Sequence, residues 1–372
     1  MPAASVPVLR PRLPPVELLL PYLRRIDETR IYSNWGPLND ELEHRLALHF
    51  GVPGAALVSA GSGTVALFAA VLAAAGRARA ERPLAVVPAF TFVATAAAVE
   101  QCGFEVRLAD VDAETWALDP QAVLGMPDLD RVGVVVPVAP FGRPVRQQPW
   151  LDFRERTGIP VAIDGAATFE LLPTSKEFAG ELPVAVSFHA TKSFSTGEGG
   201  CVISLDPDCR DRAARALNFG FHELRDSTMP STNGKLSEYH AAVGLAGLDA
   251  WPQRSAELED VAESYRRTCA AAGIEGRLYT VPEIGSNYVL FRCADAEHAR
   301  RVQDGLAEHE VDYRLWYGRG LHRQSYLLEA TGSFPVTDVL APNLLGLPMA
   351  PDLSHSDIET IAAGLAAGTA HG

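Results

Sequence analysis

From about residue 40 onward the sequence alternates between helical stretches and short apolar runs, and this alternation constrains the fold more than any other feature. Each run is rich in Val or Ile and is bounded by Gly, Pro or Asp, which is the pattern of a buried strand. Strands that alternate with helices are typical of an α/β domain with a mainly parallel sheet. We therefore predict strands at residues 84–87, 106–108, 132–138, 160–163, 184–188 and 201–205.

Helices are predicted within and after this alternation. Residues 40–50 place leucines among charged side chains, and residues 64–75 are alanine-rich and apolar on most sides, as expected for a helix packed against a sheet. After Trp251 and Pro252 the sequence becomes charged and amphipathic. In this C-terminal part we predict an amphipathic segment at 254–272, a strand at 287–291 and helices near 296–309 and 356–367.

The chain has 372 residues. At about 150 residues per domain, this length allows two to three domains. The change of pattern after Trp251 suggests a boundary there. We expect an N-terminal arm at 1–28, with residues 1–20 extended, a large domain at 29–250 and a smaller domain at 251–372.

Charge and composition exclude several classes of protein. There are 32 basic and 46 acidic residues, and a net charge of −14 repels phosphate backbones and anionic lipid, so we expect no nucleic-acid partner and no membrane partner. Residues 1–20 lack the apolar core of a signal peptide. Residues 46–76 carry no Asp, Glu, Lys or Arg, but Gly, Pro and Ser interrupt them. No unbroken apolar run in this segment therefore reaches the roughly 20 residues that a membrane-spanning helix needs. Five scattered Cys without Cys-x-x-Cys spacing indicate a reduced, cytoplasmic protein and no metal site.

A glycine-rich turn, Ser59-Ala60-Gly61-Ser62-Gly63-Thr64, follows an apolar run and precedes the helix predicted at 64–75. Glycines let the backbone approach an anion, and the first N–H groups of a helix have no internal partner, so the turn has the form of a phosphate site. It lacks the Lys of a P-loop and the third Gly of a dinucleotide fingerprint, which argues against ATP and NAD. A tight connection without a ligand is the alternative interpretation.

Asp164 stands at the carboxyl end of the strand predicted at 160–163, where open α/β sheets bind their ligands. The same position also suits a helix N-cap, so both interpretations stay open. A functional carboxylate there would be buried and would need a cation or N–H donors to stay charged. A protonated pyridine nitrogen is one such cation.

Lysine is rare in this chain, which has 29 Arg but only Lys176, Lys192 and Lys235. Imine formation requires an amine that can be neutral and nucleophilic, a state that Arg does not reach. Lys176 has polar neighbours typical of the surface, whereas Lys192 lies between a strand end and a glycine-rich segment. A phosphate cradle, a buried Asp and a lone Lys are together the groups that pyridoxal 5′-phosphate (PLP) requires.

With these segments in view, the sequence resembles the DegT/StrS-type sugar aminotransferases, which are PLP enzymes of the aspartate-aminotransferase fold (fold type I). The resemblance extends over most of the chain, and residues 187–200 are its most specific part. It implies a large domain with a mainly parallel mixed sheet and a smaller C-terminal α/β domain. The matching segments are 34–38 with Glu43, 62–67, 88–95, 164–166, 187–200, 233–236, 241–245, 321–322 and 347–348.

The resemblance also implies roles for individual residues. Lys192 would form the internal aldimine with PLP, and Asp164 would pair with the pyridine nitrogen. Phe92 would stack on the ring. The phosphate would be bound by Ser62, Gly63, Thr64, Ser187 and, from the other subunit of a homodimer, Asn233.

Two positions depart from the family pattern. Ala167 stands three residues after Asp164, where many members carry Gln or His near the 3′-oxygen of the cofactor. Lys235 stands where Arg is frequent, with a role toward a substrate anion or on the surface. Arg314 and His322 are further candidate substrate contacts. The alternative for Arg314 is a surface ion pair, and the alternative for His322 is a structural role.

The expected reaction transfers an amino group from glutamate or glutamine to a keto sugar, in the first place a nucleotide-linked keto-6-deoxyhexose. Lys192, once freed, would serve as general base and then as general acid. A keto-inositol acceptor is one alternative, and a PLP-dependent sugar dehydratase is another, although relatives with that chemistry carry His in place of the Lys. A non-catalytic protein that retains the fold is a third.

Overall fold

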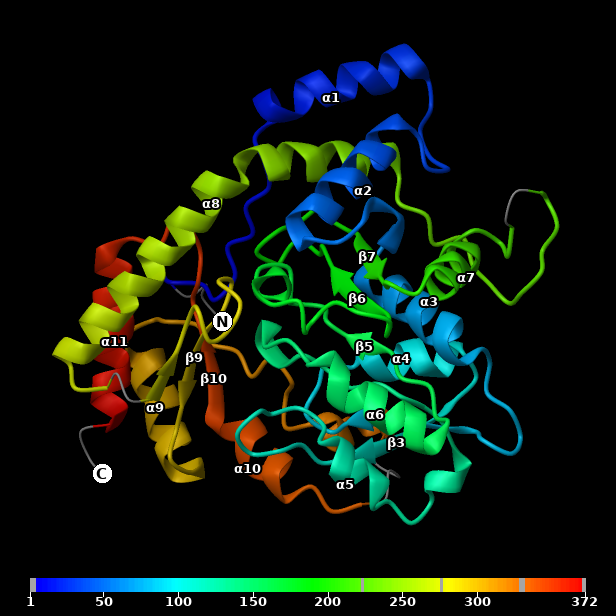
Figure 1. Cartoon of the computed structure of the whole chain (residues 1–372). Helices are drawn as coiled ribbons and strands as arrows, with labels where there is room; N and C mark the ends of the chain where they lie inside the picture. The colour runs from blue at the N-terminus through cyan, green and yellow to red at the C-terminus, as the bar shows by residue number, and fades with distance from the viewer. Residues whose placement is uncertain (1–4, 222–223, 275–276, 328–331, 370–372) are drawn as a thin grey trace.

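The structure is a computed structural model that describes residues 5–221, 224–274, 277–327 and 332–369 (Figure 1). The strands of its larger sheet are β1 (Leu57–Ala60), β2 (Leu84–Pro88), β3 (Glu105–Ala109), β4 (Val132–Val135), β5 (Ile163–Asp164), β6 (Val184–Ser187) and β7 (Gly200–Ile203). One part has the order β1-β7-β6-β5 and the other β3-β2-β4. The parts are joined because Ala162 N donates to Val135 O at 3.1 Å and Asp164 N donates to Pro137 O at 2.9 Å.

The sheet is mixed but mainly parallel. β2 is parallel to both β3 and β4, and β5 is parallel to β6, whereas β7 runs antiparallel to β1 and β6. All residues of β1, β2, β6 and β7 are buried. Burial on both faces explains why these strands read as apolar runs. The predicted α/β class is confirmed, although the strand predicted at 160–163 is shorter and begins at Ile163.

Helices cover the larger sheet (Figure 1). They are α2 (Pro37–Phe50), α3 (Gly63–Ala75), α4 (Ala94–Gln101), α5 (Pro120–Leu124), α6 (Gln147–Thr157) and α7 (Pro207–Leu217). α3 is buried continuously from Ala66 to Ala73, which explains its small apolar residues. Ser62 caps α3, because its side chain accepts a hydrogen bond from Val65 N at 3.2 Å.

The C-terminal part has its own antiparallel sheet in the order β10-β9-β8, formed by β8 (Leu278–Tyr279), β9 (Val289–Arg292) and β10 (Leu344–Leu347). Its helices are α9 (Ala296–Glu308), α10 (Pro335–Asn343) and α11 (His355–Thr369). The long helix α8 (Glu238–Ala271) runs from the larger sheet to this part (Figure 1). The domain boundary proposed at 250/251 therefore lies inside a helix, since α8 continues through Pro252.

One expectation for the N-terminus is wrong. Residues 16–20 are not extended, because α1 (Val16–Thr29) begins at Val16 and packs along α8 (Figure 1). Pro15 directly precedes the helix, a place that proline tolerates because the first N–H groups of a helix need no partner. Short 3₁₀ helices occur at Gly54–Ala56, Leu129–Arg131, Pro140–Gly142, Leu172–Thr174, Leu321–Arg323 and Ser325–Leu327.

Within the described ranges, every helix is too short or too polar to cross a lipid bilayer.

Candidate active site

A cavity of about 670 Å³ lies at the carboxyl ends of the parallel strands. This volume is in the range of small-molecule sites, which is roughly 300–1,000 Å³. Turns that follow β1, β2, β5 and β6 line one side of it, and residues 314–318 and Tyr288 of the C-terminal part line the other. Of the residues predicted from sequence, the cavity brings together Ser62, Gly63, Thr64, Phe92, Asp164, Ser187, Lys192 and Arg314.

Asp164 ends β5 and is 7% exposed. Its carboxylate accepts hydrogen bonds from Thr95 Oγ1 at 2.7 Å and from Ala166 N at 3.1 Å. Burial raises the pKa of Asp164, and the two donors and the charge of Lys192 only partly oppose this rise. β5 is followed by a turn rather than by an α-helix, so the helix N-cap interpretation is wrong. The carboxyl is a buried acceptor held by neutral donors.

The glycine-rich turn becomes the start of α3. A Cβ built on Gly63 would lie 2.5 Å from Cβ and 2.6 Å from Oγ of Ser187, so only glycine allows this approach. The first N–H groups of α3 and the hydroxyls of Ser62, Thr64 and Ser187 are thereby gathered at one end of the cavity. This end has the donors and the helix dipole that bind a phosphate.

Lys192 lies in a tight loop after β6. The loop is closed by two backbone hydrogen bonds, from Phe188 N to Gly199 O and from Ala190 N to Gly197 O, each 2.8 Å long. The amine Nζ of Lys192 donates a hydrogen bond to the hydroxyl of Tyr288 at 3.1 Å. The amine is therefore held inside the cavity that Asp164 also lines.

The C-terminal wall carries Arg314 and Trp316. The guanidinium of Arg314 lies 5.5 Å from the ring centre of Trp316, and the backbone of Arg314 pairs with that of Gly346. A side chain on Gly346 would collide with the Trp316 indole, so this glycine lets the ring pack against β10. Arg314 is exposed at the mouth of the cavity, where it can meet an anionic part of a substrate.

Three predicted residues lie outside the cavity lining. Asn233 is exposed and accepts a hydrogen bond from Lys235 Nζ at 2.7 Å. Lys235 also lies over the ring of Phe219 at 4.6 Å, and partial burial lowers its pKa. The buried ring of His322 pairs with Asp338 at 2.9 Å and packs on Phe334. Their roles toward phosphate or substrate stay predictions.

Sequence reasoning missed three residues of the site, namely Thr95, Tyr288 and Tyr317. Thr95 lies in the first turn of α4, and it was within reach of prediction because another hydroxyl residue, Thr91, stands four residues before it. Tyr288 was read only as part of a strand, and no local pattern places its hydroxyl on Lys192. Tyr317 accepts a hydrogen bond from Phe141 N at 3.4 Å, and burial raises its pKa.

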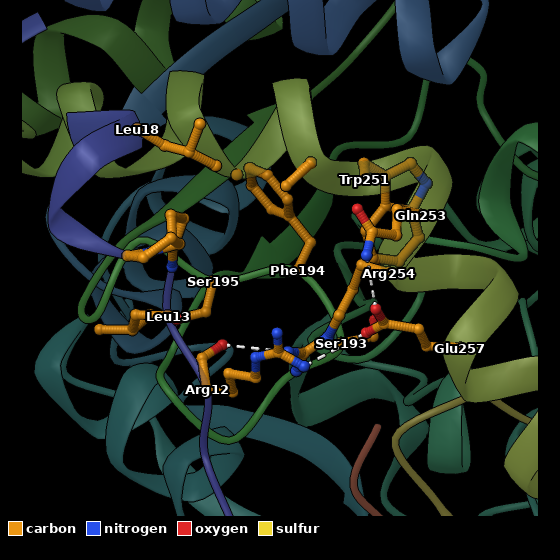
Figure 2. Close-up of a pocket in the computed structure, with 14 residues that line it drawn as sticks. Arg12, Leu13, Leu18, Ser193, Phe194, Ser195, Trp251, Gln253, Arg254 and Glu257 are labelled. Atoms are coloured by element: carbon orange, nitrogen blue, oxygen red, sulfur yellow. Dashed lines mark hydrogen bonds and ion pairs between the residues drawn. The ribbon is translucent and has the colours of Figure 1, made fainter. Parts of the chain in front are cut away.

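A second, smaller cavity of about 160 Å³ lies between residues 12–18, α8 and the loop after Lys192. Leu13 and Leu18 lie toward one end of it, and Arg254 and Glu257 toward the other (Figure 2). One ion pair lies here, with Arg12 Nη1 3.3 Å from Glu257 Oε2. Arg254 Nη1 donates to the backbone oxygen of Arg12 at 3.2 Å, while Arg254 Nε is buried without a hydrogen-bond partner among the described residues.

Together the fold and the larger cavity define an α/β enzyme whose site combines an anion-binding helix N-terminus, a buried carboxylate and an amine. Residues 17–366 match the DegT/DnrJ/EryC1/StrS aminotransferase family, and the chain belongs to this family. It is a PLP-dependent sugar aminotransferase.

Several known proteins are similar to this chain. Protein Rv3402c of Mycobacterium tuberculosis (strain ATCC 25618 / H37Rv) is 30% identical, over 96% of this chain and 89% of that protein. The dTDP-4-amino-4,6-dideoxy-D-glucose transaminase of Shigella dysenteriae is 31% identical over 65% of this chain and 64% of that protein. The crystal structure of DesI in the presence of its TDP-sugar product has a TM-score of 0.84 and 29% identity, with 98% of this chain and 94% of that chain covered.

The residues around the cavity fit PLP. The approach of Gly63 to Ser187 makes a cradle that a Cβ would fill. At the same time, burial raises the pKa of Asp164, as expected for a carboxyl that gains stability when a cation arrives. A lysine amine completes the set that this cofactor requires.

Proposed function

We propose that this protein transfers an amino group from glutamate or glutamine to a nucleotide-linked keto-6-deoxyhexose, with Lys192 and Asp164 as its catalytic residues. The observation that carries the proposal is that Lys192, Asp164 and the start of α3 line one cavity. PLP, when bound, supplies an aldehyde that takes up and passes on an amino group and a ring that accepts electrons.

Each group of the chain then has a defined task. Ser62, Gly63, Thr64 and Ser187 bind the phosphate at the N-terminus of α3. Asp164 would accept a hydrogen bond from the protonated ring nitrogen of the cofactor and so keep the ring electron-poor, and Phe92, which also lines the cavity, would pack against the ring. The amine of Lys192 is the attachment point, and once free it takes and returns a proton at Nζ.

The acceptor side of the proposal is supported by the cavity mouth and by the relatives. Arg314 stands there with an exposed guanidinium that can pair with a diphosphate or a carboxylate. The Shigella dysenteriae relative is a transaminase for a dTDP-linked dideoxyglucose, and DesI has a TDP-sugar product. We infer a sugar of the same class for this chain.

We also propose a homodimer in which Asn233 reaches the phosphate of the partner's site. Asn233 is exposed and does not line the cavity of its own chain, although its neighbour Gly234 accepts a hydrogen bond from Gly61 N at 2.7 Å, directly beside the cradle. Phe92 is 58% exposed and Phe219 46% exposed. Apolar rings of this size near a site entrance suit a surface that a second subunit covers.

The reaction is tested by loading the protein with pyridoxamine 5′-phosphate and adding candidate acceptors. dTDP-4-keto-6-deoxyglucose, a 3-keto isomer and a keto-inositol form the panel, and transfer of the amino group restores the visible absorbance of bound PLP. We expect a response to a nucleotide-linked keto sugar and none in the Lys192→Ala variant. A response to the keto-inositol alone would replace the proposed acceptor, and silence of the whole panel would reject amino transfer to these acceptors.

The shared site is tested by mixing two inactive variants, Lys192→Ala and Asn233→Ala, after dissociation and reassembly. Each mixed dimer would contain one site with both native residues. Activity should then return to about a quarter of the wild-type value, since half of the dimers are mixed and each has one intact site. No recovery in a confirmed mixed dimer would contradict the role of Asn233 across the interface.

A further inference from the structure

Tyr288 lines the cavity, and nothing above assigns it a role. Its hydroxyl accepts the hydrogen bond of Lys192 Nζ at 3.1 Å, and Nζ also lies 5.8 Å from the centre of its ring. Tyr288 immediately precedes β9 of the C-terminal sheet, whereas Lys192 follows β6 of the larger sheet. The contact therefore connects the two sheets at the amine itself.

The loop that carries Tyr288 is fastened independently of this contact. One of its bonds reaches the residue next to Lys192 in sequence, which fixes the loop relative to the amine. The bonds run from Gly285 N to Phe141 O at 2.8 Å, from Ser286 Oγ to Glu170 Oε1 at 2.6 Å, and from Asn287 Nδ2 to Thr191 O at 3.1 Å.

The ring of Tyr288 is also fixed by packing. It meets Phe141 and Trp316 edge-on, at centroid distances of 5.4 Å and 5.3 Å, and is 7% exposed. Such contacts leave the ring little freedom to turn out of the wall. The hydroxyl therefore has a defined place opposite the amine.

We propose that Tyr288 is a positioning residue that holds the amine of Lys192 in the cavity whenever that amine is free. The inference rests on the proposed function, in which Lys192 takes and returns a proton at Nζ. Lysine has a flexible four-carbon side chain, and a proton carrier works only within hydrogen-bond reach of the reacting atoms. A fixed hydroxyl restricts the conformations of the Lys192 side chain to those that keep the amine within reach of the reacting atoms, and so contributes to proton transfer.

The test is Tyr288→Phe, which keeps the ring and its packing but removes the hydroxyl. We expect kcat to fall about tenfold while KM for the keto sugar stays within about twofold, because the hydroxyl acts on the proton carrier and not on substrate binding. The isotope effect of glutamate deuterated at its α-carbon should rise at least about 1.5-fold, because proton transfer becomes more rate-limiting.

Tyr279→Phe is the matched control. Tyr279 belongs to the same aromatic cluster, 5.0 Å from Trp116, but does not line the cavity. Its loss of a hydroxyl should leave the isotope effect unchanged. A Tyr288→Phe protein with lower thermal stability but an unchanged isotope effect and kcat would show a merely structural role and overturn the proposal.

Asn287→Ala is the second variant, for use if Tyr288→Phe does not fold. It removes only the bond to Thr191 and should lower kcat about threefold with the same rise in isotope effect; no change in either would also reject the proposal. Failure of the proposed function is distinguishable, because in that case wild-type protein would not transfer an amino group, or Lys192→Ala would keep the visible absorbance of bound PLP.

Discussion

The loop after β6 contributes residues to two neighbouring cavities, which differ in the chemical groups that line them. Lys192 lines the larger one, and the next three residues, Ser193, Phe194 and Ser195, line the smaller one. In the larger cavity, hydroxyls, a carboxyl and an amine come together from separate turns. In the smaller one Arg12 forms an ion pair with Glu257, and Phe194 stacks on Phe169 at 4.3 Å. Space alone therefore does not make a site, whereas a carboxyl, an amine and several hydroxyls that converge on one cavity of suitable volume do.

If this comparison is right, substitutions in the larger cavity change the chemistry and substitutions in the smaller one change only stability. The largest effect is expected for Lys192→Ala, which removes the only amine that the described residues place in the larger cavity. Turnover should fall about 10⁴-fold or more, and the visible absorbance of bound PLP should be lost. Lys176→Ala, at an exposed lysine, is the control and should keep both. Retention of either property by Lys192→Ala would refute the assignment of this residue.

Asp164→Asn should have the next largest effect. The amide keeps the size of the side chain but cannot hold a proton on the ring nitrogen of PLP, so kcat should fall about a hundredfold or more. Steady-state kinetics with saturating PLP measure this loss. Activity within a few-fold of wild type would show that the buried carboxyl is structural.

The same variant makes a prediction about stability and pH in the PLP-free protein. Burial raises the pKa of Asp164 in the folded chain, so the folded state binds more protons than the unfolded state between the ordinary pKa of 3.8 and the raised one. The contribution of Asp164 to the free energy of unfolding is therefore largest at low pH and declines as pH rises through that window. Urea unfolding at a series of pH values should show a smaller decline for Asp164→Asn, and an equal decline would contradict the raised pKa.

Gly63→Ala should weaken PLP binding without direct loss of a reacting group. The added Cβ would lie 2.5 Å from Cβ of Ser187 and would push the start of α3 away from it. We expect the Kd for PLP to rise about tenfold, as measured by absorbance titration, because the N–H donors of the helix leave the phosphate. Gly54→Ala is the control, since a Cβ there meets nothing within 4 Å.

The smallest effect is expected for Arg12→Ala, a substitution in the smaller cavity. Its ion pair with Glu257 is exposed, with half of the Arg12 side chain accessible, and such pairs contribute about 0.2–1 kcal/mol. Thermal unfolding should show a loss of that size, while kcat and KM stay within about twofold of wild type. A tenfold loss of activity would show that residues of the smaller cavity affect catalysis, and it would contradict the proposed difference between the two cavities.

Much of the fold and several site residues could be predicted because their signals are local. Strands buried on both faces must be apolar along their whole length, so β2, β6 and β7 stand out in the sequence. The scarcity of lysine singled out Lys192, and a strand end singled out Asp164. α1 was missed because prolines before and within residues 16–29 obscured a helix that packs along α8.

Other parts of the site depend on contacts between residues that are distant in sequence. The sequence by itself determined the α/β class, the family and the groups that PLP requires, because strand burial, the helix start and the choice of Lys over Arg each depend on a few neighbouring residues. Only the tertiary structure decided that Tyr288 meets Lys192 across 96 residues and that His322 pairs with Asp338 instead of lining the cavity. The first contact depends on how the two sheets pack together and the second on how the turn at Leu321–Arg323 packs against α10, and no local sequence pattern encodes either arrangement.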